Sequence, residues 1–361
     1  MSYYNSIWKL TQRERMRIAA GLLTLRRQLE GEQGIPAKTT ERNLLLATWN
    51  IREFGGGKYE RCPDCYYFIA EIIDHFDLVA VQEVREDLGA LKQVMKILGS
   101  WWHYIVTDVT LGAAGNNERL AFLYDSRKVR FDGLSGEIVL PPRKKAPVRQ
   151  MARTPFVCGF RAGWTRFEIC TVHIYYGSSK AEDPVRVAEI RSLAELLSKR
   201  AEKKPANKAE KARRIQPPNV ILLGDFNIFD SKNDKTMKAF KDNGFRVPEE
   251  ISGAYTNKLR DKNYDQIAFY EVAKRFEVKQ KEVFDYYQSV FSNKHQKEYN
   301  ELAGGKKKFD TWRTFQMSDH LVLWTELQID FSENYLAVLL RSGKPGKRQH
   351  ARGASPGRHQ A

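Results

Sequence analysis

Hydrophobic and polar positions change their period repeatedly along the chain. From Leu44 onward, short runs of β-branched and aromatic residues alternate with stretches of helical spacing. At least nine runs predict strands: LLLATWN, LVAVQEV, HYIVT, RLAFLY, TPFVCGF, TRFEICTVH, NVILLGDF, YDQIAFY and LVLWTELQI. Because no Pro/Gly-rich boundary separates these runs, the pattern predicts a single large β-rich domain with interspersed helices.

Helical spacing of apolar residues occurs first over residues 7–31, which read as an amphipathic arm. The arm could pack on the main domain or on a partner, and packing on the main domain is our default expectation. Further helices are predicted over 64–75, 87–98 and 184–200. We therefore expect an arm over 1–40, a main domain over 41–330 with a basic insertion at 198–217, and a short helix with a basic flexible tail over 331–361.

The charge of the chain is concentrated in two segments. The formal net charge is +16, and residues 198–214 and 341–361 each contribute a net +6, so the remaining chain is only weakly basic. Such segments can hold phosphate backbones without choosing a sequence, or can serve as solvated tails. Both interpretations of these segments stay open, and nucleic acid is the partner that the first one predicts.

The composition excludes several other classes of protein. A hydrophobic content of 42% is that of a globular protein. Neither an export signal nor a run of about eighteen apolar residues is evident, so we expect a cytoplasmic protein without a membrane segment. Four cysteines are too few for a disulfide framework, and the C-x-x-C at Cys62 and Cys65 lacks a second pair to complete a zinc site. We expect a structural role for this pair.

Five of the predicted strands end in a polar or ionisable group. These groups are Asn50, Glu83, His173, the pair Asp225 and Asn227, and the pair Asp319 and His320. A single acid in such a place is usually a helix cap or a turn residue. Five complementary endings are far less expected by chance, so their coincidence predicts a catalytic site.

The spacing of two of these pairs constrains how they can act. Asp225 and Asn227 stand two residues apart, so an extended chain directs both side chains to one face. Alternatively, they bond their own backbone in a turn. Asp319 and His320 are adjacent and can serve one site only from a bend before the strand LVLWTELQI. A histidine there suits acid–base chemistry, because its pKa lies near neutrality.

Taken together, these segments resemble the endonuclease/exonuclease/phosphatase superfamily. The motifs TWNIR, QEVR, TVH, GDFN, YDQIAF and SDH occur in the family's order, and the resemblance runs from about Leu44 to Ile329. It implies an α/β fold, a four-layer α/β/β/α sandwich of two packed mixed β-sheets flanked by helices. It also implies a hydrolase that acts on phosphoester bonds.

The resemblance further implies a metal site. Glu83 would be the principal ligand of Mg²⁺, with Asn50 and Asp319 nearby, and Mn²⁺ or Ca²⁺ are alternatives. A hard cation of this kind takes oxygen ligands, which these residues supply. Asp225 and Asn227 would orient the scissile phosphate and the attacking water.

Two histidine–carboxylate pairs are also implied. His173 and His320 would flank the phosphate, with Glu118 supporting the first ring and Asp265 the second, because a carboxylate that accepts an imidazole N–H fixes the ring tautomer. As alternatives, Glu118 could be an exposed charge and Asp265 a cap at the start of a strand. The general base stays open between a histidine and Asp225.

Motif details favour one branch of the superfamily. Arg85 and His173 stand where abasic-site endonucleases usually carry a lysine and a Tyr-x-Pro-Asn run, which favours a pancreatic-type deoxyribonuclease arrangement. In that arrangement Arg85 would contact the backbone of nucleic acid near the minor groove. Asn116 and Gln266 replace a tyrosine and an arginine of the nuclease pattern.

Three classes of function follow from the sequence. The first is Mg²⁺-dependent hydrolysis of nucleic acid, with a DNA endonuclease as our main hypothesis. The second is a phosphodiesterase or phosphatase for lipid or small-molecule esters, in which Tyr175 and Tyr176 would shape a pocket. The third is a binding module with a silent site, and the complete set of acidic and histidine positions argues against it. The sequence makes no prediction of oligomeric state.

Overall fold

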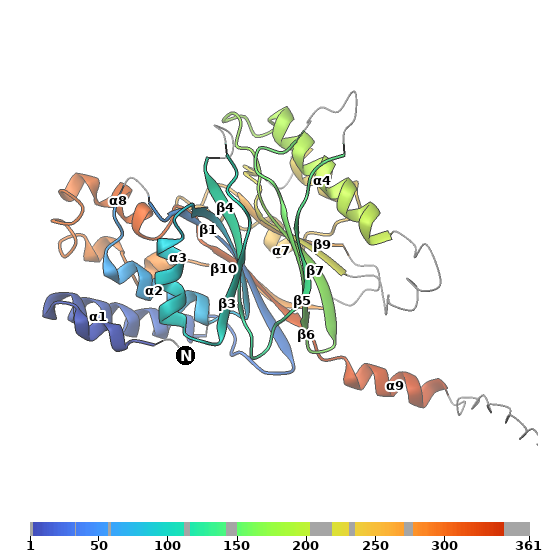
Figure 1. Cartoon of the computed structure of the whole chain (residues 1–361), viewed down its shortest axis with the longest axis horizontal. Helices are drawn as coiled ribbons and strands as arrows, with labels where there is room; N and C mark the ends of the chain where they lie inside the picture. Colours follow the sequence, from blue (N-terminus) through green and yellow to red (C-terminus); the bar gives the residue numbers. More distant parts are fainter. Residues whose placement is uncertain are drawn as a thin grey trace, which may run out of the picture.

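Two β-sheets packed face to face, with helices on both outer faces, form the body of the molecule (Figure 1). This computed structural model describes residues 3–32, 34–56, 59–111, 116–141, 150–202, 219–230, 235–270 and 277–342. The predicted four-layer sandwich is confirmed. Most of the predicted basic insertion, and the tail from residue 343, lie outside the described residues.

The first sheet has the strand order β10-β11-β1-β2-β4-β3. Its strands are β1 (Asn43–Phe54), β2 (Leu78–Arg85), β3 (Trp102–Val106), β4 (Glu118–Asp125), β10 (Val278–Phe284) and β11 (Val322–Gln328). β1 and β2 are parallel and the other neighbours are antiparallel, so the sheet is mixed. The carboxyl ends of β1 and β2, which carry Asn50 and Glu83, therefore meet at one edge.

The second sheet has the order β5-β6-β7-β8-β9. Its strands are β5 (Arg130–Glu137), β6 (Phe156–Ala162), β7 (Thr165–His173), β8 (Asn219–Asp225) and β9 (Asp265–Tyr270). β7 and β8 are parallel, and their register pairs His173 with Asp225. β8 and β9 are antiparallel and pair Asp225 with Asp265. Three of the predicted site residues are thus aligned across neighbouring strands.

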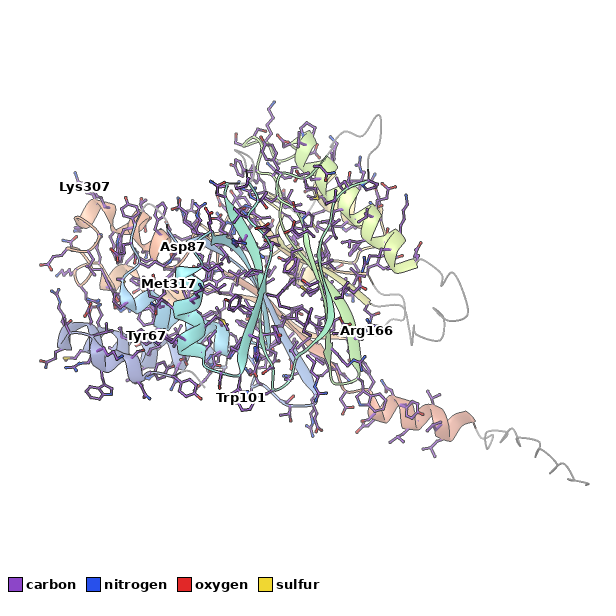
Figure 2. The ribbon with its side chains drawn as sticks, viewed as in Figure 1. Tyr67, Asp87, Trp101, Arg166, Lys307 and Met317 are labelled. Atoms are coloured by element: carbon purple, nitrogen blue, oxygen red, sulfur yellow. The ribbon has the colours of Figure 1, made fainter. Side chains whose placement is uncertain are left out.

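Helices cover the outer faces of both sheets (Figure 1). The first sheet carries α1 (Gln12–Leu29), α2 (Pro63–Asp74), α3 (Gly89–Leu98) and α8 (Phe309–Gln316), and the second carries α4 (Pro184–Glu202) and α6 (Lys235–Lys241). The remaining helical segments are η1 (Asn5–Lys9), α7 (Glu249–Ser252), η2 (Tyr286–Gln288), η3 (Asn293–His295), η4 (Lys306–Lys308) and α9 (Ser332–Ser342). Figure 2 shows Tyr67 and Met317 in the helical layer of the first sheet and Arg166 on the second sheet.

The amphipathic arm packs on the body of the molecule. Thr11 caps α1 through a capping box with Glu14. The apolar face of α1 is buried against α2, and its members are Ile18, Leu22, Leu25 and Leu29. Arg17 and Asp64 form a buried ion pair between these two helices. The default expectation of packing is therefore confirmed, although the chain is extended at Leu10, between η1 and α1.

The nine predicted strands are all present, and the structure adds β5 and β10. Both of these lie at sheet edges. The side chains of β5 are largely exposed, and β10 carries three charged residues in the run VKQKEVF. Polar edge strands lack the apolar runs by which buried strands are found, which explains why both were missed.

Two apolar layers stabilise this arrangement. One lies between the sheets and includes Phe122, Phe160 and Ile221. The other lies between the first sheet and its helices and includes Trp49, Phe68 and Trp324. None of the helices in the described ranges is both long and apolar enough to cross a bilayer.

Candidate active site

Asp225, at the carboxyl end of β8, lies at the centre of a cluster of buried polar side chains. Its Oδ2 atom lies 3.5 Å from Nε2 of His173 and 3.7 Å from Nε2 of His320. The same oxygen accepts a hydrogen bond of 3.0 Å from Nδ2 of Asn50. The structure therefore brings three of the predicted residues, from three separate segments, to the carboxylate of Asp225.

The backbone around Asp225 makes this approach possible. Gly224 has a φ of +133°, and a Cβ atom at this position would lie 2.2 Å from the carbonyl oxygen of Val172. Only glycine fits such a close approach of two strands. Asn227 has a φ of 52°, and its N–H donates to Oδ1 of Asp225 over 2.9 Å. The turn considered from the sequence thus exists, and it leaves Oδ2 of Asp225 facing the histidines.

Each histidine ring is held by a second carboxylate. Nδ1 of His173 lies 2.8 Å from Oε1 of Glu118, and Nδ1 of His320 lies 2.8 Å from Oδ2 of Asp265. Both supporting acids are buried, with exposures of 1% and 0%, so Glu118 is not an exposed charge. With Nδ1 occupied, Nε2 of each ring is the atom that faces Asp225.

The charges of these groups depend on one another. Burial alone would lower the pKa of His320, but Asp265 and Asp225 outweigh it and raise that pKa well above its ordinary value. Burial likewise opposes the charge of His173, whose pKa is raised by Glu118. Burial favours the neutral form of Asp225, yet the two imidazoles hold its pKa below the usual range. The cluster therefore stabilises the charged forms of His173, His320 and Asp225, whereas burial raises the pKa of Asp265.

Glu83 and Asn50 fit the hard cation that the resemblance implies. Glu83 accepts hydrogen bonds from Nδ2 of Asn50 over 3.0 Å and from the N–H of Glu53 over 2.9 Å. Oδ1 of Asn50 is buried and has no hydrogen-bond partner among the described residues. Burial raises the pKa of Glu83, and Glu118 adds to this effect. A bound cation would satisfy the amide oxygen and neutralise the carboxylate.

Two groups of side chains in the described parts of the chain have the spacing of metal ligands. One comprises Glu83, Glu118 and His173, and the other Asp225, Asp265 and His320; within each, the ligand atoms lie within 4.8 Å of one another. In both groups a histidine is already paired through Nδ1 with an acid. Glu83 has no such partner, and unlike Asp225 it has no ion pair with a histidine Nε2 among the described residues, which favours Glu83 as the ligand.

Asp319 and Arg85 are engaged with neighbouring protein groups. Asp319 is 45% exposed and lies 3.3 Å from Nη1 of Arg52. Arg85 donates to the carbonyl oxygen of Asn116 over 2.6 Å, and its Nη2 lies 3.8 Å from Oε1 of Glu53. The expected bend before β11 is present, because Asp319 and His320 precede Val322, where the strand begins.

Asn227 uses part of its amide for the fold. Its Nδ2 donates to the carbonyl oxygen of Ile174 over 2.8 Å, and the side chain is 5% exposed. This bond fixes the orientation of the amide beside Asp225. The second N–H of Nδ2 is the group with which Asn227 could contact a phosphate oxygen.

Three residues that the sequence analysis missed complete the site. Arg153 forms an ion pair with Oε1 of Glu118. Ser318 donates to the carbonyl oxygen of Asn50 over 2.6 Å and accepts the N–H of His320. The ring of Tyr264 lies 5.4 Å from that of His320. Ser318 and Tyr264 adjoin predicted residues, which was a usable signal, whereas nothing in the sequence around Arg153 indicated its contact.

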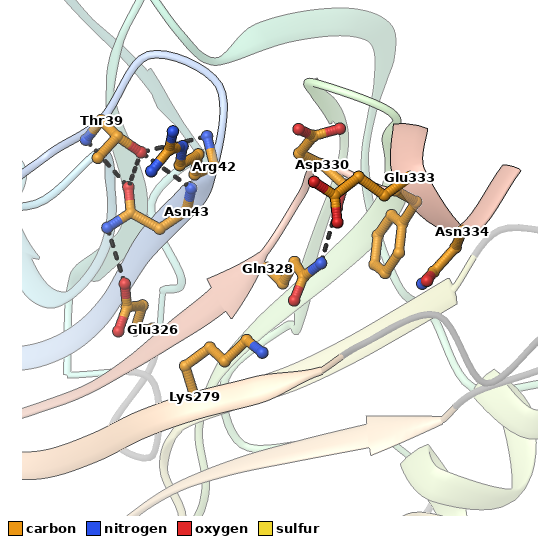
Figure 3. Close-up of a pocket in the computed structure, with 10 residues that line it drawn as sticks. Thr39, Arg42, Asn43, Lys279, Glu326, Gln328, Asp330, Glu333 and Asn334 are labelled. Carbon is orange, nitrogen blue, oxygen red and sulfur yellow. Dashed lines mark hydrogen bonds between the residues drawn. The ribbon is translucent and has the colours of Figure 1, made fainter. Parts of the chain in front are cut away.

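A pocket of about 700 Å³ lies at the opposite end of β1 and β11 (Figure 3). At this pocket, Nδ2 of Asn43 donates a hydrogen bond of 2.8 Å to Oε1 of Glu326, and Oδ1 of Asn43 accepts a hydrogen bond from the hydroxyl of Thr39. Its lining also includes Arg42 and Lys279, but no histidine. Without a histidine, the side chain whose ordinary pKa lies nearest neutrality, this pocket is a poorer candidate for the catalytic site than the cluster around Asp225.

Comparisons with known proteins give matches in structure alone. Neither a family model nor a curated protein matches the sequence. D. rerio TDP2, humanized by 14 mutations, shares 14% identity, with 79% of this chain and 98% of that chain covered and a TM-score of 0.51. ANGEL2, a 2',3'-cyclic phosphatase, shares 12%, with 82% and 99% covered and a TM-score of 0.51. The human Nocturnin catalytic domain with bound sulfate shares 14%, with 79% and 94% covered and a TM-score of 0.50.

These matches and the sandwich of two mixed sheets define the fold of the chain. The chain has the fold of the endonuclease/exonuclease/phosphatase superfamily, to which TDP2, ANGEL2 and Nocturnin belong. The fold that the resemblance implied is thereby confirmed. At these identities the likeness concerns the fold, and the chemistry depends on the side chains of this chain.

Proposed function

We propose that the chain hydrolyses phosphodiester bonds of nucleic acid with Mg²⁺ as cofactor, Mn²⁺ and Ca²⁺ being the alternatives, and that it cuts DNA internally. One observation carries the proposal: His173 and His320, each backed by a buried acid, turn Nε2 toward Asp225. Glu83 and the unpaired amide oxygen of Asn50 lie beside them. Acid–base groups next to a cation site are what hydrolysis of a phosphodiester requires.

In this proposal, the position of each side chain determines its role in hydrolysis. Asp225 and Asn227 orient the phosphate and the attacking water at the end of β8. Nε2 of one imidazole accepts a proton from the attacking water. Nε2 of the other imidazole donates a proton to the leaving oxygen. Glu118 and Asp265 hold the rings through Nδ1, which keeps both Nε2 atoms directed inward. A bound cation supplies charge neutralisation at the phosphoryl oxygens when present.

Cationic side chains around the site favour a polyanionic substrate. Arg52, Arg85, Arg153 and Lys258 are partly exposed near the cluster or the residues that adjoin it. The basic segments 198–214 and 341–361 add charge that can follow a phosphate backbone. A further structural match is D. rerio TDP2 complexed with single strand DNA product, with a TM-score of 0.50 and 14% identity. Together these features support nucleic acid as the substrate.

The test is cleavage of defined substrates by the purified chain. Plasmid, linear duplex, single-stranded DNA, RNA and a chromogenic phosphodiester are incubated with Mg²⁺, Mn²⁺ or Ca²⁺, or with a chelator. We expect metal-dependent nicking of plasmid that is lost in Asp225→Ala, Glu83→Ala and His320→Ala. His103→Ala, which removes an exposed histidine on β3, is the matched control and keeps full activity. Full activity in Glu83→Ala and His320→Ala would remove the assigned site.

A small phosphate ester is the second candidate substrate. The ring of Tyr176 lies 5.6 Å from that of Phe229, which lies 5.6 Å from Tyr264, beside His320. Such an aromatic wall could bind a base or another flat group of a small substrate. Turnover of the chromogenic diester, without cleavage of any polymer, would favour this alternative and contradict the nuclease proposal.

A further inference from the structure

Cys62 and Cys65 form a close pair of thiols outside the candidate active site. Cys62 is the N-cap residue of α2, Pro63 occupies the first turn, and Cys65 follows within the same turn. Their Sγ atoms lie 3.3 Å apart, and both cysteines are free. A disulfide has a sulfur–sulfur distance of about 2.05 Å, so the two atoms are in contact and unbonded.

The two thiols differ in their access to solvent. Cys62 is partly exposed, whereas Cys65 is fully buried. Cys62 stands at the N-terminal end of α2, where a small oxidant can reach it from solvent. An accessible thiol beside a buried one is the arrangement in which the first reacts and the second resolves the product. Neither cysteine joins a group with metal-ligand spacing in the described parts of the chain.

Gln316 connects this thiol pair to the candidate active site. Its Oε1 atom accepts the N–H of Cys62 over 2.8 Å and the S–H of Cys65 over 3.1 Å. Gln316 is the last residue of α8 and stands four residues before His320. Its carbonyl oxygen accepts a bond from Arg61, which also donates to the carbonyl oxygen of Glu53. A change at Cys65 therefore alters a bond to the segment that carries Ser318 and His320.

We propose that Cys62 and Cys65 are an oxidative modification site, at which a low-molecular-weight disulfide reversibly converts the two thiols into an intramolecular disulfide. Cys62, as thiolate, attacks one sulfur of the oxidant, forms a mixed disulfide and releases one thiol. Cys65 then loses its proton and attacks Sγ of Cys62, which expels the second thiol. The two cysteines lose two electrons and the oxidant gains them. Oxidation removes the S–H donor that Cys65 presents to Gln316.

The other two cysteines provide an internal control. Cys158 and Cys170 are fully buried on neighbouring strands. The register pairs Cys158 with Ile169 and Val157 with Cys170, so the thiols are not directly opposite. Burial raises the pKa values of Cys158 and of Cys65 alike, so the difference between the pairs is access: only the first pair includes a partly exposed thiol, that of Cys62. These two thiols are expected to stay reduced under conditions that oxidise the first pair.

The first experiment counts thiols in the full-length protein. The reduced chain is equilibrated in buffers of stepped oxidised-to-reduced glutathione ratio, quenched with acid, alkylated under denaturing conditions and mapped by peptide mass. We expect the free thiols to fall from four to two, with a Cys62–Cys65 disulfide that dithiothreitol reverses. Cys158→Ser with Cys170→Ser keeps this transition, and Cys62→Ser abolishes it. Four free thiols in the most oxidising buffer, or a stable glutathione adduct on Cys62, would overturn the proposal.

A second measurement tests the connection through Gln316. Hydrogen–deuterium exchange of the peptide that spans residues 309–321 is compared between the oxidised and reduced chain. Exchange is expected to become at least twofold faster on oxidation in the wild-type chain and to be unaffected by the same treatment in Cys62→Ser. Equal exchange in both states would disprove the connection. Neither measurement requires catalysis, so failure here is distinguishable from failure of the proposed hydrolysis.

Discussion

Gly224 shows how one residue without a side chain positions its neighbour Asp225 in the candidate active site. We predict that Gly224→Ala lowers the free energy of unfolding by more than about 2 kcal/mol, because the added Cβ atom would press on the carbonyl oxygen of Val172 and the backbone is strained at this φ. Urea denaturation followed by tryptophan fluorescence measures the change. Gly136→Ala is the matched control, since a Cβ atom there meets nothing within 4 Å. Equal stability of the two variants would show that the close approach is not required.

Asp265 is expected to act through His320 and not on the substrate directly. Asp265→Asn should lower kcat roughly 10- to 100-fold with little change in KM, because a hydrogen bond to a charged group contributes about 1.5–3 kcal/mol. Steady-state kinetics on the preferred substrate measures this split, with Asp242→Asn on the exposed surface as the control. A variant that loses thermal stability in proportion to activity would instead indicate a structural role for Asp265.

At the scale of residues, the sequence predicted those that stand in short motifs and missed those held by distant contacts. Asp225 could be predicted because it ends an apolar run, and His320 because it directly precedes one, each with a group of suitable chemistry. Arg153 could not, since its contact with Glu118 joins a loop to a strand 35 positions earlier in the chain. Hydrophobic periodicity does not indicate contacts between residues that are so far apart in the sequence.

The helix α1 shows how an element becomes part of the body. We predict that Leu25→Ala lowers the free energy of unfolding by about 2–5 kcal/mol, because Leu25 is fully buried against the layer that contains α2. Met16→Ala, at a position that is 67% exposed on the same helix, should change it by no more than about 0.5 kcal/mol. Chemical denaturation checks both values. Equal small effects would mean that α1 contributes little to the stability of the fold.

At the scale of elements, burial decides which strands the sequence reveals. β8 is covered on both faces, so its residues form a continuous apolar run that ends sharply at Asp225. β5 lies at an edge with Gly133 and Gly136 within it, and its alternation is too weak to separate it from a loop. The strands that carry the site are largely buried, including the edge strand β9 with Asp265, which is why the site was predictable although the polar edge strands β5 and β10 were not.

For the whole molecule, the site exists only because two sheets pack together. Asn50 and Glu83 come from β1 and β2 of the first sheet, whereas His173 and Asp225 come from β7 and β8 of the second. Both parallel pairs direct their carboxyl ends to the same side, and the hydrogen bond from Asn50 to Asp225 crosses between the sheets. Hydrophobic periodicity predicts each strand separately. The packing of the two sheets was predicted from the order of the motifs, which resembles that of the superfamily.

The basic tail offers a test of substrate class that involves the whole chain. Deleting residues 343–361 removes five lysines and arginines. If the tail holds phosphate backbones, the slope of log affinity for duplex DNA against log salt concentration becomes shallower by about 0.9 for each phosphate that the tail had neutralised. Filter binding or anisotropy over a salt series, with a catalytically inactive Asp225→Ala chain, measures this slope. Turnover of a small chromogenic diester by the truncated active chain is expected to stay unchanged, because a small diester has no phosphate backbone for the tail to hold. An unchanged slope would identify the tail as a solvated segment without a part in binding.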